Sequence, residues 1–130
     1  MDNSLLVGKY IYKLLSEDIV LSGKVSQKKI FPLVANADTT YPFIVYARTG
    51  LAVDYCKDGT VENKIDFQIL SVSDNYVESL EVANQIRNIL EMKRYKEEDI
   101  CIRECKLYSV AEEYMEDAFI QRLNFTIKTD

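Results

Sequence analysis

The chain has 130 residues, the size of one ordinary domain, which can bury a core without help from metals or disulfides. Hydrophobic residues make up 48% of it and charged residues 28%, a composition that excludes wholesale disorder. The net charge of −5 argues against specific nucleic-acid binding, because a protein that neutralises phosphates needs a basic face.

The sequence contains no apolar run of 18 residues, so no association with a membrane is expected. Met1–Ser4 carries an acid where a signal peptide carries basic residues, and the three cysteines are an odd number. Both features favour a reducing, cytoplasmic compartment. No repeat, low-complexity tract or linker divides the chain, which predicts a single domain over residues 1–130.

Residues 3–17 have the apolar spacing of a helix, which Asn3 or Ser4 can cap. The predicted apolar face consists of Leu6, Val7, Tyr10, Ile11, Leu14 and Leu15. Gly23 ends the stretch that follows.

Two strands are predicted next, over 24–34 and 41–49, separated by a polar loop over 35–40. Pro32 removes a backbone donor, so the first of these strands is expected at an edge or at a bend.

A hairpin is predicted from 51–57 and 61–72, because Asp58-Gly59 lies between two apolar runs. In its second strand, Ile65, Phe67 and Ile69 share one side.

The clearest helix is predicted over 75–93, where Asn75 and Glu78 form a capping box. A second hairpin follows, with strands near 100–110 and 117–128. Its turn carries Glu112, Glu113, Tyr114, Met115, Glu116 and Asp117.

This element order predicts an α+β fold with a mainly antiparallel sheet and two helices packed on one face. The predicted core contains Leu14, Phe67, Ile69, Leu80, Ile86, Leu90, Leu123 and Phe125.

Histidine is absent, which removes the commonest general base and the imidazole metal sites. Cys101 and Cys105 suggest a metal site at first, but four residues apart on one face of a strand they lie about 13 Å apart. We therefore expect free thiols, no cofactor, no metal and no enzymatic activity.

The acidic turn lacks the glycine that a calcium loop requires at its bend. It is either a solvated hairpin tip or a rim that faces a partner, and Tyr114 and Met115 favour contact. We name Asp58, Gly59, Glu112, Glu113, Tyr114 and Met115 as candidate interface residues.

The middle of the chain reads Ile30-Phe31-Pro32-Leu33-Val34 and, after a gap, Tyr41-Pro42-Phe43-Ile44-Val45-Tyr46. Further on, Ile65-Asp66-Phe67-Gln68-Ile69 precedes the long helix. In order and spacing this resembles the tail completion, or tail terminator, family of long-tailed phages and prophages. The residues that carry the resemblance are Phe31, Pro32, Leu33, Tyr41, Pro42, Phe43, Tyr46 and Asp66.

The resemblance implies a non-enzymatic α+β protein that forms a ring, commonly of six copies, on the end of the tail tube. Such a ring stops tube growth and meets the head–tail connector, so the implied partners are further copies of the chain, the tail tube protein and the connector protein. The implied location is the host cytoplasm during assembly and then the virion tail.

Three other functions remain open on the sequence. The chain could be a head–tail connector or neck subunit or another minor tail protein, a small ligand- or peptide-binding module, or an enzyme that uses carboxylates.

Overall fold

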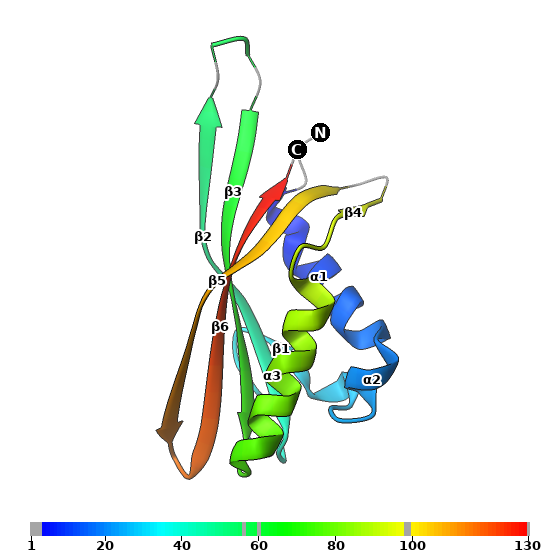
Figure 1. Ribbon diagram of the computed structural model, residues 1–130, viewed down its shortest axis with the longest axis vertical. Coiled ribbons are helices and arrows are strands. Elements are labelled where there is room, and N and C mark those ends of the chain that lie inside the picture. Colours follow the sequence, from blue (N-terminus) through cyan, green and yellow to red (C-terminus); the bar gives the residue numbers. More distant parts are fainter. Residues whose placement is uncertain (1–3, 56, 60, 98–99, 130) are drawn as a thin grey trace.

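The computed structural model describes residues 4–55, 57–59, 61–97 and 100–129. Its framework is a six-stranded sheet in the order β1-β2-β3-β6-β5-β4 (Figure 1). The strands are β1 Ile30–Pro32, β2 Phe43–Tyr55, β3 Val61–Ser73, β4 Tyr95–Lys96, β5 Cys101–Met115 and β6 Ala118–Thr129. Four long strands therefore form the centre, and a short strand lies at each edge.

Strand directions are mainly antiparallel, as the sequence predicted. β2, β3, β6, β5 and β4 alternate in direction, and only β1 runs parallel to its neighbour β2. Pro32 lies in the edge strand β1, where its missing N–H costs no bond within the sheet.

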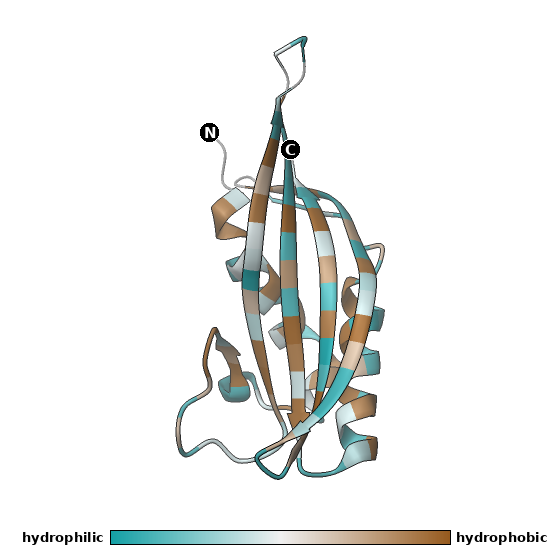
Figure 2. Cartoon of the chain, turned by 90° about the vertical axis from the view of Figure 1, so that its left-hand side faces the viewer, coloured by the Kyte–Doolittle hydropathy of each residue, from teal (hydrophilic) through white to brown (hydrophobic). Residues whose placement is uncertain are grey.

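All helices lie on one side of the sheet, and the other face is open (Figures 1 and 2). They are α1 Val7–Glu17, α2 Ile19–Ser22 and α3 Tyr76–Leu90, with 3-10 turns at Ser4–Leu6 and Gln27–Lys29. This confirms the α+β fold and adds the short α2, which the sequence pattern did not predict. Asp18 is the N-cap of α2, and its carboxylate accepts the N–H of Leu21 at 2.8 Å.

The predicted core is largely confirmed. Phe67, Ile69, Ile86, Leu90, Leu123 and Phe125 are buried, and Leu14 is half-buried. The prediction that Leu80 is buried is wrong, since 38% of this residue is exposed. The adjacent Ser79 faces the sheet instead, and its carbonyl accepts the buried hydroxyl of Ser71 at 3.0 Å. Neighbouring helical residues point about 100° apart, so Leu80 turns away.

The prediction that Ser4 caps the first helix is also wrong, because α1 begins at Val7 and has no side-chain cap. Ser4 is buried, and its hydroxyl bonds Thr129 at 2.6 Å and accepts from the Asn63 amide at 2.9 Å. This contact ties the start of the chain to the ends of β3 and β6. Asn3, the other candidate cap, lies outside the described residues.

The cap of α3 is confirmed. The Asn75 side chain accepts the N–H of Glu78 at 3.0 Å. In a capping box the Glu78 side chain would also accept the backbone N–H of Asn75. Here Ser73 lies between them: its hydroxyl donates to Glu78 at 2.6 Å and accepts the Asn75 N–H at 3.1 Å.

Three strand boundaries differ from the sequence-based prediction. The strand expected over 24–34 shrinks to β1, because a turn of 3-10 helix occupies Gln27–Lys29. The strands expected over 41–49 and 51–57 are one strand, β2, with a register shift between Arg48 and Gly50. β5 extends to Met115, five residues beyond its expected end. β2 continues through its register shift because β3 pairs with it on both sides of that point. β5 likewise continues because β6 pairs with it on both sides of its own register shifts.

Candidate assembly surface

Aromatic rings from the family-like motif gather beside β1. Phe31 meets Phe43 edge-on with ring centroids 6.4 Å apart, and Tyr41 stacks on Phe43 at 5.6 Å. Pro42 joins Tyr41 to Phe43 through a cis peptide bond. After β1, the Leu33 N–H donates to the Tyr46 carbonyl at 2.9 Å, and Leu33 itself takes a positive φ of 65°.

An apolar patch forms where this motif meets the open face of the sheet, and we call it the terminal patch. It surrounds a shallow hollow of about 330 Å³. Its principal residues are Leu33, Val34, Tyr41, Val72, Met115 and Ile120. Leu33 is 75% exposed and Val34 74%, so most of their apolar surface faces water. The fold thus joins the motif to Met115, a candidate interface residue more than 70 positions after Tyr41 in the sequence.

Glu112 and Glu113 lie on β5 and not in the turn, which corrects their predicted position. The Glu112 carboxylate accepts the Tyr76 hydroxyl at 3.0 Å and the Gln121 amide at 3.1 Å. Glu113 forms an ion pair with Arg122 on β6. The bond to Glu112 raises the pKa of Tyr76. Glu113 is therefore engaged within the sheet, and Glu112 is engaged by the sheet and by the start of α3.

The turn itself consists of Glu116 and Asp117, both with positive φ, at 52° and 63°. Just before it, Tyr114 stacks on Phe119 at 4.8 Å, and the edge of Tyr76 meets the same ring at 5.5 Å. These contacts pack the hairpin tip against the start of α3, beside the terminal patch.

Asp58 and Gly59 lie at the far end of the molecule, at the tip of the arm formed by β2 and β3 (Figure 1). Gly59 has a φ of 87°, a conformation that favours glycine. The structure therefore separates these two candidate interface residues from the terminal patch by the length of the sheet.

Tyr46 and Asp66 contribute to the scaffold. Tyr46 stacks on Phe67 at 6.1 Å and meets Tyr12 in a tilted contact at 6.2 Å, and burial raises the pKa of its hydroxyl. Asp66 lies on the open face, and its carbonyl accepts the hydroxyl of Thr49 at 3.1 Å.

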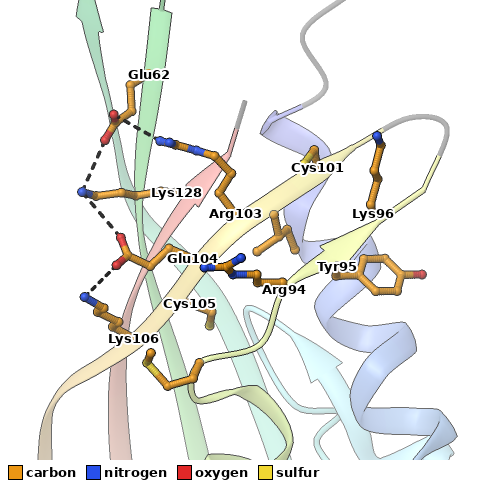
Figure 3. Close-up of a pocket in the computed structure, with 12 residues that line it drawn as sticks. Glu62, Arg94, Tyr95, Lys96, Cys101, Arg103, Glu104, Cys105, Lys106 and Lys128 are labelled. Atoms are coloured by element: carbon orange, nitrogen blue, oxygen red, sulfur yellow. Dashed lines mark ion pairs between the residues drawn. The ribbon is translucent and has the colours of Figure 1, made fainter.

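A second hollow, of about 640 Å³, lies beside β4 and the first part of β5 (Figure 3). Its wall carries a chain of ion pairs: Glu62 with Arg103 at 3.2 Å and with Lys128 at 3.4 Å, then Glu104 with Lys128 at 3.5 Å and with Lys106 at 2.7 Å. Lys106 lowers the pKa of Glu104, and Glu62 raises that of Lys128.

Sequence reasoning missed this hollow, although basic residues concentrated in β4, β5 and β6 were a signal for it. Two glutamates, Glu62 and Glu104, pair with three of its five basic residues, so the lining keeps an excess of positive charge. It offers no nucleophile–base pair, and we assign no chemistry to it.

The two cysteines of β5 are free, as predicted, but do not share one face. A register shift between Ile102 and Glu104 places Ile102 and Cys105 on the helix side of the sheet, so Cys101 falls on the other side. Burial raises the pKa of the Cys105 thiol from 9.0 to about 12. Cys56 lies outside the described residues.

Among the described residues, no three Cys, Asp or Glu side chains lie close enough to hold a metal ion. None of the described helices is long and apolar enough to cross a membrane.

Comparison with known proteins bears on the fold. No family model matches the chain, and no curated protein matches it. A chain from the solved virion of a native gene transfer agent (GTA) particle matches with a TM-score of 0.74 and 15% sequence identity, over 92% of this chain and 90% of the other. The two chains share a fold. The match includes nearly all of the sheet and helices.

Proposed function

We propose that this chain is a non-enzymatic structural protein of a phage or related particle. The observation that carries the proposal is its fold, which matches a chain of the gene transfer agent virion over 92% of its length. An exposed apolar patch supports assembly rather than catalysis, because surfaces of this kind mark sites of protein contact.

Within that class we propose the role of a tail terminator, a ring of copies on the end of the tail tube. The motif from Phe31 to Tyr46 supports this role, since Leu33 and Tyr41 contribute to the terminal patch. On this proposal the patch docks to the tail tube protein or to the connector protein, and the particle tail is the final location.

The test is deletion of the gene from the phage or prophage that encodes it, followed by electron microscopy of the particles. A terminator mutant makes full heads and separate tails of irregular, often excessive, length. Complementation with the wild-type gene should restore tails of uniform length joined to heads.

Tails of normal length that fail to join heads would favour a connector or neck subunit. Normal, joined tails would exclude both roles and favour the binding-module function.

A further inference from the structure

The two long outer strands of the sheet each have a stretch of backbone without a partner. On the outer side of β5, β4 pairs only with Cys101 and Ile102, and Met92 bonds the carbonyl of Cys105. Beyond that point, residues 106–115 pair only with β6 in the part of the chain that the structure describes. We call this stretch the β5 free edge.

β2 has a matching stretch at the opposite side of the sheet. β1 pairs with residues 44–46, and the Leu33 N–H bonds the Tyr46 carbonyl. Among the described residues, 47–55 then pair only with β3. We call this stretch the β2 free edge.

Both free edges expose apolar side chains. On β5, Tyr108 is 59% exposed and Val110 50%; on β2, Tyr55 is 81% exposed. Monomeric proteins protect such edges with proline, lysine or short strands, because unpaired backbone groups recruit further strands. Here β1 covers only the first part of the outer edge of β2, and β4 covers only the first part of the outer edge of β5.

The directions of the two strands suit pairing between copies. β2, β3, β6 and β5 alternate in direction, so β2 and β5 run antiparallel within one chain. If a second copy is placed beside the first in the same orientation, its β5 lies antiparallel to the β2 of the first. A regular antiparallel ladder can then form without reversing either chain.

The positions of β1 and β4 determine how the copies are displaced. Residues paired in register across β2, β3, β6 and β5 form one row across the sheet. Ile44, beside β1, is in the same row as Glu112, and Leu51 is in the same row as Cys105, next to the part of β5 that β4 covers. The two free edges are therefore offset along the sheet and share only the rows in which 47–50 lie opposite 106–109. They pair along most of their length only if the neighbour is displaced along the strand direction, and a closed ring accommodates that displacement by tilting its strands, as a barrel does.

We propose that copies of this chain assemble by pairing the β5 free edge of one with the β2 free edge of the next, in a head-to-tail sheet with this displacement. The contact joins two different surfaces, which is the kind of interface that generates a ring. The inference rests on the proposed role in assembly, and it names the contact through which the copies associate.

The test compares variants of the purified full chain by sedimentation velocity at up to about 1 mM, where even weak contacts are populated. Tyr108→Lys with Val110→Lys blocks the β5 free edge. Val53→Lys with Tyr55→Lys blocks the β2 free edge. Ile19→Lys is the matched control, because Ile19 is 86% exposed on α2 and lies on neither edge.

Wild type and the control should form species larger than a dimer, and each blocked variant alone should remain monomeric. An equimolar mixture of the two blocked variants should give a one-to-one dimer and nothing larger, since one intact edge of each kind remains. Dimer formation also shows that both variants are folded.

Three results would overturn the inference: a wild-type chain that stays monomeric, a blocked variant that still assembles like wild type, or a mixture that stays monomeric although both variants keep wild-type circular dichroism. The deletion phenotype is independent of these measurements. Irregular tails together with unaltered association of the blocked variants would therefore reject the edge contact and leave the tail role standing.

Discussion

Phe67 links the core to the motif that resembles the tail terminator family. Its ring is buried, stacks on Tyr46 and lies near Gly8 of α1. The alternating strand pattern predicted this burial correctly. The helical spacing predicted in the same way that Leu80 is buried, but Leu80 is 38% exposed. The pair shows that periodicity identifies a broad apolar face and that packing selects the residues at its centre.

Phe67→Ala should lower the free energy of unfolding by about 3–5 kcal/mol, because it leaves a cavity in a packed core. Leu80→Ala is the control and should cost less than about 1 kcal/mol, as surface changes do. Urea unfolding followed by circular dichroism measures both. Similar losses for the two variants would contradict the assigned positions.

The two cysteines of β5 should differ in reactivity. The thiolate is the reactive form, and a pKa of about 12 leaves Cys105 almost entirely protonated at pH 8. Cys101 is only half-buried. Alkylation of the folded chain at pH 8, followed by mass spectrometry of peptides, should therefore label Cys101 well before Cys105. Equal labelling in the folded state, with unfolded chain as the reference, would show that Cys105 is accessible.

At the scale of elements, loop and strand ends that are distant in sequence converge on the terminal patch. The segment after β1 contributes Leu33 and Val34, and the end of β5 contributes Met115. The sequence of either segment does not indicate an apolar patch, because each segment has the pattern of a turn between strands. Their convergence follows from the strand order, which brings β2, β3 and β6 together beneath them.

Leu33→Asp with Val34→Asp should abolish incorporation into particles without reducing the thermal stability of the monomer. Both side chains are exposed in the isolated chain, so the substitutions place charges in water there and in an apolar contact only after docking. Ile19→Asp with Val20→Asp on exposed α2 is the matched control. Electron microscopy of particles complemented with each variant gives the readout, and normal tails from the Leu33/Val34 variant would remove the terminal patch from the docking surface.

At the scale of the whole molecule, the buried contact of Ser4 with Asn63 and Thr129 joins three distant parts of the chain. It fastens the N-terminal turn to the sheet and supports folding as one unit. With all helices on one face, the opposite face and the two free edges remain available for partners (Figure 2).

Asn63→Ala should destabilise the chain by about 1–3 kcal/mol, because removing the amide leaves buried polar groups without their bond. The unfolding should still be a single transition. Far-UV circular dichroism and tyrosine fluorescence in urea should therefore give coincident curves for wild type and variant. Separate curves would show that the N-terminal segment unfolds independently of the sheet.

The sequence by itself determined the α+β class, both long helices, the hairpin at Asp58-Gly59 and most of the core, because alternation, helical spacing and turn residues are local properties. Only the tertiary structure decided that β2 is one strand through Gly50, that β5 reaches Met115, and that Glu112 and Glu113 are paired within the sheet. Each of these features depends on a partner strand contributed from elsewhere in the chain. The terminal patch and the two free edges have the same origin, since strand order and register determine which groups meet and which remain unpaired.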